Sequence, residues 1–262
     1  MKKNASVFFT VILILFTSSC AEEKNPSASE NLSDFVETIT IIKKALEIDR
    51  GSIQEYDFLI FLTVADEKKD AINSINLTFP NGRKLEITRE IQTLEGHEQI
   101  CGFIKEDPAA PHAWFYRNIA MPNMDEFSDG IYQFQINHDS GTEEFMIEFK
   151  DPETGASIPV PEFGTVLAPE ENEELTSPVS VSVGDHGKKI GLYFGLPDLE
   201  GGGFLEQRDY EMPAGTNKSE PVDLVPGNWR GELNISEGVS GEINGVAWQL
   251  DVVATYEFGF TV

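Results

Sequence analysis

The sequence predicts an all-β protein in which two β-sandwich domains follow one another along the chain. From about residue 35 onward, apolar and polar residues alternate with a period of two, the pattern of strands that bury one face. Turn residues recur roughly every ten residues, and no long helical period interrupts the alternation. A proline-rich segment separates two regions of this kind, so each region is expected to form its own core.

The first residues predict a secretory signal peptide over residues 1–19. Lys2 and Lys3 give a positive start, residues 7–16 form an apolar run, and the small residues 17–19 follow. A membrane-spanning helix needs about 20 apolar residues, so this run is too short to span a bilayer. A charged start, a short apolar stretch and small residues in this order are typical of a leader that is removed on export.

Cys20 follows directly after the small residues, and this placement resembles the lipobox of bacterial lipoproteins, although that family prefers Leu where this chain has Thr17. The resemblance implies that the Cys20 thiol carries diacylglycerol, and two or more acyl chains hold a protein stably at a membrane. Ala21, where an Asp would favour the inner membrane, implies the outer membrane of a bacterial envelope. Residues 20–34 are polar, so we expect a flexible linker behind the lipid anchor. The alternative is an ordinary signal peptide with a cysteine nearby.

Charge and cysteine content restrict the partners. The formal charge is −26, and it becomes −28 without residues 1–19, which contain two lysines and no acid. Such an acidic chain does not favour nucleic acid, because binding to phosphates depends on Lys and Arg. With Cys20 lipidated, Cys101 has no cysteine partner and is expected to be a buried apolar residue. The expected partners are the membrane, through the anchor, and a protein or a glycan.

The first sandwich is predicted over residues 35–151. Alternating segments at 132–136 and 145–149 flank a turn and predict a hairpin. A second hairpin is predicted around residues 81–82, because Asn-Gly supplies the backbone angles of a tight turn. The run 56–64 is apolar on both faces and suits a central strand.

Two segments of this domain are less regular. Residues 35–46 fit both a helical stripe and a strand, and their β-branched run favours the strand. Residues 90–130 are predicted to form a long irregular insertion, and this insertion contains the candidate ligand-binding residues Trp114, Phe115, Tyr116 and Arg117. Exposed rings there would form a platform for a glycan. If the insertion packs over the sheet, the rings are buried instead, which is the commoner use of aromatic side chains.

The second sandwich is predicted over residues 170–262, after a linker at 152–169 that contains four prolines. Every even position from 246 to 262 is apolar, which predicts one long strand or two strands joined by a bulge. Trp229 and Trp248 share the parity of apolar neighbours and are expected in the core. Short strands and frequent turns indicate that both domains are of immunoglobulin-like type.

The search for catalytic and metal-binding motifs is mostly negative. The chain has no Gly-x-Ser-x-Gly elbow, no His-Glu-x-x-His pair and no phosphate-binding glycine loop. His97, Cys101 and His112 could supply metal ligands, but scattered surface residues explain them better, and no metal or other cofactor is predicted. Residues 123–130 fail as a calcium loop because Phe127 stands where an oxygen ligand belongs.

These features predict an exported, lipid-anchored protein of the bacterial envelope with a binding or structural role and no enzymatic activity. One alternative is a carbohydrate-binding surface protein that uses residues 112–117. The other is a membrane-tethered hydrolase that uses acids of the insertion, such as Asp125 or Asp129. A hydrolase of this kind would need two carboxylates at a fixed separation in a cleft.

Overall fold

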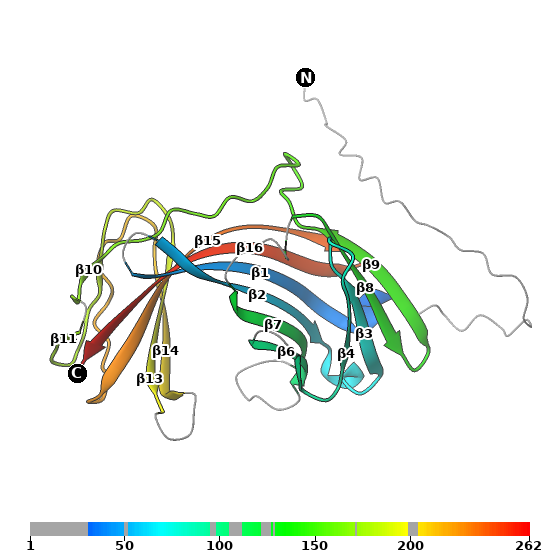
Figure 1. Cartoon of the computed structure of the whole chain (residues 1–262), viewed down its shortest axis with the longest axis horizontal. Helices are drawn as coiled ribbons and strands as arrows, with labels where there is room; N and C mark the ends of the chain where they lie inside the picture. Colours follow the sequence, from blue (N-terminus) through cyan, green and yellow to red (C-terminus); the bar gives the residue numbers. More distant parts are fainter. Residues whose placement is uncertain are drawn as a thin grey trace, which may run out of the picture.

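The computed structural model describes residues 31–49, 52–94, 98–104, 112–121, 127, 129–170, 172–198 and 204–262, and these residues form an almost purely β structure (Figure 1). No α-helix occurs in these ranges, and the helical turns are short 3-10 segments such as η1 (Leu32–Asp34) and η2 (Asp66–Lys68). The predicted all-β fold is therefore confirmed. Among the described residues, no helix is long and apolar enough to cross a bilayer. The signal peptide and Cys20 lie outside the described residues.

Most strands belong to one ten-stranded sheet with the order β14-β13-β15-β16-β1-β2-β7-β6-β5, in which β11 also pairs with β16. Its strands are β1 (Val36–Asp49), β2 (Ser52–Val64), β5 (Gln92–Leu94), β6 (Glu98–Ile104), β7 (Ala113–Met121), β11 (Glu173–Glu174), β13 (Ile190–Pro197), β14 (Phe204–Met212), β15 (Asn228–Ile243) and β16 (Val246–Thr261). A four-stranded sheet has the order β4-β3-β8-β9 and contains β3 (Ile72–Thr78), β4 (Lys84–Thr88), β8 (Ile131–His138) and β9 (Gly141–Glu148). A two-stranded sheet pairs β10 (Val166–Ala168) with β12 (Ser182–Val183).

Three long strands hold the two ends of the molecule together. β15 and β16 form a hairpin with sixteen residues in each strand, and their register continues without a shift along its whole length. Asn244 and Gly245 close the hairpin with φ angles of 49° and 79°, which the Asn-Gly pair adopts readily. β1 pairs in parallel with β16, and all three strands run across the molecule (Figure 1). The expected strand at residues 35–46 and a single long C-terminal strand are both confirmed.

Two hydrophobic cores pack on one face of the ten-stranded sheet. The first lies between this sheet and the four-stranded sheet, and the second packs β13, β15 and β16 against β10, β12 and their flanking segments. On β16, the first core takes Leu250 and Val252, and the second takes Tyr256, Phe258 and Phe260. All five positions are even, and because side chains alternate between faces, both cores lie on the same side. The predicted packing of sheets into a sandwich is confirmed.

The alternating pattern did not indicate that both halves share one sheet. The division of the chain at residues 152–169 stays a prediction, but the first core contains Val246, Leu250 and Val252 from beyond that segment. One strand, β16, thus serves both cores. The expected linker at 20–34 is also too long, because Leu32 is buried in the first core.

The sequence predicts irregular structure for residues 90–130, but the described parts of this segment are regular. β6 and β7 are regular strands inside the ten-stranded sheet, and β7 pairs with β2 on one side and β6 on the other. The side chains of Ala113, Trp114, Phe115 and Tyr116 at the start of β7 are all buried. Period two does not detect a strand that is apolar on both faces, and the apolar run 113–116 ends at Arg117, so it is shorter than the run 56–64 that predicts a central strand.

Candidate functional site

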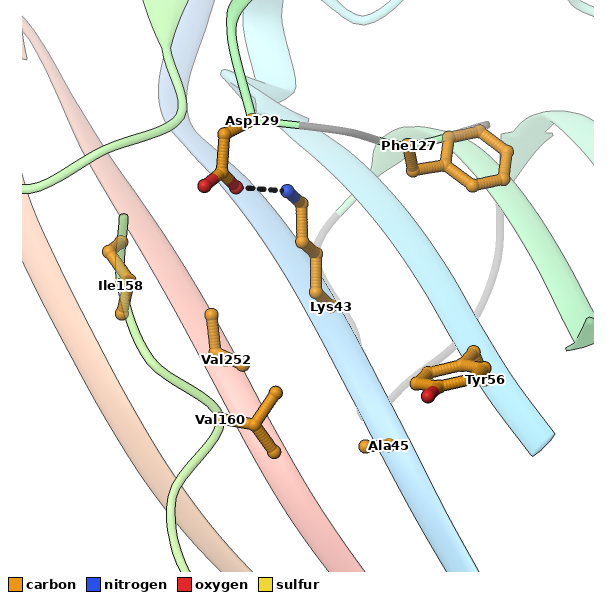
Figure 2. Close-up of a pocket in the computed structure, with 8 residues that line it drawn as sticks. All are labelled: Lys43, Ala45, Tyr56, Phe127, Asp129, Ile158, Val160 and Val252. Carbon is orange, nitrogen blue, oxygen red and sulfur yellow. Dashed lines mark hydrogen bonds and ion pairs between the residues drawn. The ribbon is translucent and has the colours of Figure 1, made fainter. Parts of the chain in front are cut away.

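Two pockets lie on opposite faces of the ten-stranded sheet, both of them touching β1 and β16. The first, which we call the core-side pocket, has a volume of about 240 Å³. One of its walls is formed by Ile158 and Val160, which belong to the proline-rich segment at residues 152–169. Figure 2 shows its full lining, which consists of Lys43, Ala45, Tyr56, Phe127, Asp129, Ile158, Val160 and Val252.

Lys43 and Asp129 form an ion pair at this pocket (Figure 2). The two charged atoms, Lys43 Nζ and Asp129 Oδ1, are 2.7 Å apart, and Nζ also lies 3.9 Å from the ring centroid of Phe149. The lysine side chain is 7% exposed and the aspartate side chain 39%. Burial therefore lowers the pKa of Lys43, although Asp129 acts in the opposite direction. Burial acts against the Asp129 carboxylate too, but hydrogen bonds from Lys43 and Ser157 outweigh it and lower the pKa of Asp129.

This ion pair limits what the core-side pocket can do chemically. Asp129 is the only acid among its eight lining residues, and its carboxylate already accepts a hydrogen bond from Lys43. Hydrolysis by paired carboxylates needs a second acid at a fixed distance. Asp125, the other acid considered from the sequence, lies outside the described residues. The core-side pocket is thus an apolar hollow that contains one neutralised pair of charges.

The second pocket lies on the other face of the sheet, and we call it the open-face pocket. It has a volume of about 430 Å³ and is lined by Ile42, Lys44, Leu59, Lys189, Gly191, Glu211, Asn234, Ser236, Asp251 and Val253. These residues come from β1, β2, β13, β14, β15 and β16 or from positions next to them. On β1, Ile41 belongs to the first core and Ile42 to this pocket, because successive side chains point to opposite faces. Neither core, as far as the chain is described, extends to this face.

Ion pairs and hydrogen bonds fix the polar side chains around the open-face pocket. Lys44 Nζ lies 2.9 Å from Glu232 Oε2, and both side chains are mostly buried. Arg230 lies 3.9 Å from the other oxygen of the same carboxylate. The Thr255 hydroxyl donates a hydrogen bond of 2.5 Å to Asn234 Oδ1. Lys44 and Asn234 therefore meet the pocket in fixed positions, which lowers the entropy cost of binding a ligand.

Asp251 is the acid of the open-face pocket whose surroundings disfavour its charge. Burial raises the pKa of Asp251, and a hydrogen bond of 2.7 Å from Gln249 Nε2 opposes the rise only in part. The carboxylate lies over Gly238, where a Cβ would meet its oxygen. A cationic group of a ligand would stabilise the charged form of such a carboxylate.

The structure separates the four candidate residues 114–117 between the two faces of β7. Trp114 and Tyr116 have no exposed area and pack in the first core, with ring centroids 5.2 Å from Phe103 and 5.4 Å from Phe79 respectively. They therefore offer no face on which a sugar could stack. Phe115 and Arg117 point to the open face, where Phe115 is 9% exposed and Arg117 lies 3.7 Å from Asp57.

The sequence search missed the lysine pair of β1. Lys43 and Lys44 are consecutive, and one reaches the core-side pocket while the other reaches the open-face pocket. Their signal was present, because two lysines interrupt an apolar strand between Ile42 and Ala45. Lysine is rarely buried without a partner, so each one implied an acid nearby. The identity of that acid could not be read from the sequence.

The suggested metal ligands do not come together in the described part of the chain. Cys101 is free and fully buried, as expected, and burial raises the pKa of its thiol. His112 Nε2 lies 2.8 Å from Asp66 Oδ1, and His97 lies outside the described residues. Across the described ranges, no group of three or more His, Cys, Asp or Glu is placed to hold a metal ion.

Comparisons with known proteins add little. No protein-family model matches the chain, and no curated protein matches it. One solved structure that is similar is a pair of titin immunoglobulin tandem domains, A164–A165, with a TM-score of 0.22 and 8% sequence identity over 82% of this chain and 94% of that one. A likeness this low carries no conclusion about fold or function.

Proposed function

We propose that this chain is an exported, lipid-anchored protein that binds a partner through the open-face pocket and has no catalytic role. The observation that carries the proposal is the position of this pocket. Six strands of one sheet contribute to it, and it lies on the face that neither core occupies. A surface of this kind is rigid before the partner arrives, so little order has to be imposed on binding.

The side chains of the pocket suit a protein segment. Ile42, Leu59 and Val253 supply apolar area, while Lys44 and Asn234 are held in place beside them. An apolar centre with polar groups around it is the usual composition of a protein–protein interface. Glu211 is paired with Lys189, 2.5 Å away, so it is the charge of Asp251 that favours a segment carrying a basic residue.

The N-terminal residues support the anchor. Lys2 and Lys3, the short apolar run and the small residues before Cys20 have the order of a lipoprotein leader. The acidic surface has no electrostatic attraction to anionic lipid. The membrane contact would therefore be the lipid at Cys20, which holds the protein beside the bilayer. In this arrangement the bilayer provides the location and the sheet provides the binding surface.

The anchor is tested by replacing Cys20 with Ala in the full chain and fractionating the cells. We expect the parent protein in the membrane fraction with a mass that includes acyl chains, and the variant without them and released from the membrane. An intact leader, or an unmodified Cys20 thiol in the purified parent, would overturn this part of the proposal.

The binding surface is tested by photo-crosslinking in cells, with a photoreactive amino acid placed singly at Val253 or Leu59. The control position is Leu167, an exposed residue of β10 outside the pocket. We expect one discrete adduct with a second protein from both pocket positions and none from position 167. Equal adducts from position 167, or no adduct from the pocket, would contradict binding at this surface.

A further inference from the structure

β14 is an edge strand of the ten-stranded sheet and pairs only with β13 among the described strands. Its nine residues present one row of backbone groups that no neighbouring strand uses. Most of its side chains are exposed, and Leu205 has 68% of its area in contact with solvent. At the opposite end of the sheet, β5 has only three residues. The sheet can therefore be extended at β14 by a strand of similar length.

We propose that β14 pairs with β14 of a second copy of this chain, antiparallel and centred on Gln207. Two copies related by a two-fold axis place Glu206 opposite the partner copy's Arg208, and this pair occurs twice. Opposite charges in facing positions stabilise a strand pair. Within one copy, Arg208 already contacts Glu206. In the dimer, each guanidinium moves to the equivalent carboxylate across the interface, so no charge loses its partner.

Backbone geometry and charge together select this register. In an antiparallel pair, two facing residues point their backbone N–H and C=O groups the same way, and along one strand this orientation repeats every second residue. When two copies of β14 pair, the numbers of two facing residues must therefore have an even sum. A pair centred on Arg208 would put two guanidinium groups together, and one centred on Glu206 or Asp209 would put two carboxylates together. A pair centred on Tyr210 would place Asp209 opposite Glu211. The register centred on Gln207 has no facing pair of like charges and pairs residues 204–210, whereas registers centred on Phe204, Leu205, Glu211 or Met212 pair at most three residues of β14.

Other features of the chain are consistent with pairing at this edge. β9, an eight-residue edge of the smaller sheet, contains three glutamates and no basic residue, so two copies would repel each other there.

The large negative charge of the whole chain opposes association at any surface. That repulsion is screened beyond about 8 Å at physiological ionic strength, whereas the two Glu206–Arg208 pairs are in contact. β14 contributes Glu211 to the open-face pocket, but the facing residues of the proposed register, 204–210, do not line it, so this inference does not depend on the proposed function.

The register is tested with single cysteines in the full chain under mild oxidation. Gln207→Cys places two thiols opposite each other at the two-fold axis, where the Cα separation of facing strand residues allows a disulfide. Glu211→Cys is the matched control, because the proposed register separates its two copies by eight residues, or about 26 Å. We expect a disulfide-linked dimer from Gln207→Cys and none from Glu211→Cys or the parent chain. Equal crosslinking at both positions, or none at position 207, would overturn the proposal.

A charge exchange identifies the partner strand. In the Gln207→Cys chain, Arg208→Glu replaces both attractive pairs with repulsive ones, and we expect the yield of linked dimer to fall on the order of tenfold. Adding Glu206→Arg restores both pairs with reversed polarity and should restore the yield. A yield that stays low in the exchanged chain would contradict the register. Linkage of the introduced thiol at position 207 to a different protein would show that the edge binds that protein instead of a second copy.

Discussion

The ammonium of Lys43 lies 2.7 Å from the carboxylate of Asp129, but only the lysine is deeply buried. Lys43 also stacks on Phe149 inside the fold, whereas Asp129 has 39% of its side chain in solvent. The two partners therefore depend on each other unequally. Without Lys43, Asp129 keeps its contact with water. Without Asp129, the charge of Lys43 stays buried with no counter-ion.

We expect this inequality to appear when each partner is replaced. Asp129→Asn should lower the free energy of unfolding by about 1–3 kcal/mol, because a buried charge loses its partner. Lys43→Met removes the buried charge itself and should change stability by less than about 1 kcal/mol. The double variant should resemble Lys43→Met. Urea unfolding of the full chain at pH 7 measures all three, and equal losses from both single variants would contradict this account.

Trp114→Ala should destabilise the protein by about 3–5 kcal/mol, because the indole is fully buried and its removal leaves a cavity in the first core. Phe204→Ala is the matched control, since this ring is 38% exposed and its loss should cost much less. Thermal and urea unfolding give the comparison. A Trp114→Ala protein with an unchanged melting temperature and weaker retention on a polysaccharide would instead support the carbohydrate-binding alternative.

The alternation of residues predicted which positions are buried more successfully than which strands are neighbours. The alternation predicts that Phe134 and Phe145 share one face of a hairpin, and their rings stack 4.8 Å apart. The alternation does not predict that β1 pairs with β16, a pairing that joins Thr38 to Ala247 at one end and Glu47 to Tyr256 at the other. Period two indicates a face and leaves the partner strand undefined. A sheet shared by both halves therefore could not be derived from the pattern.

Strand β6 shows why residues 90–130 looked irregular. Gly102 lies inside it with a φ of 154°, and a Cβ there would come within 2.8 Å of the Ile91 backbone. A glycine in a strand pattern is usually taken as a break, but here it allows two backbones to approach. The open-face pocket could not be predicted from the sequence either, because it combines residues of β1 with residues of β13, and these strands are far apart in the sequence.

Gly231→Ala should destabilise the second core. Gly231 faces the ring of Phe258, and a Cβ at this position would overlap the Cζ atom of that ring. Overpacking of this kind typically costs about 1–3 kcal/mol. Gly187→Ala is the matched control, because no atom lies within 4 Å of its added Cβ. Both substitutions restrict the unfolded chain equally, so the difference between their urea midpoints isolates the steric effect. Equal stability of the two variants would contradict the close contact.

Asp251→Asn should stabilise the protein at neutral pH, and the gain should depend on pH. Because burial raises the pKa of Asp251 in the folded state, the native protein holds this proton more tightly than the unfolded chain does. Stability is therefore lost as the pH rises from the unfolded pKa, about 3.9, to the higher native value, and the loss persists above it. Asparagine carries no such charge and can still accept the hydrogen bond from Gln249.

The test of this pH dependence compares unfolding of the parent chain and Asp251→Asn from pH 3 to pH 8. We expect the two stabilities to converge at the acid end, and the variant to gain steadily as Asp251 ionises in the parent chain. Asp185→Asn removes one negative charge from an exposed position, so it measures the contribution of net charge alone. A gain from Asp251→Asn that is constant across the pH range, or no larger than that of the control, would show that burial does not disfavour the charge of Asp251. In that case the open-face pocket would have no electrostatic preference for a basic partner at this residue.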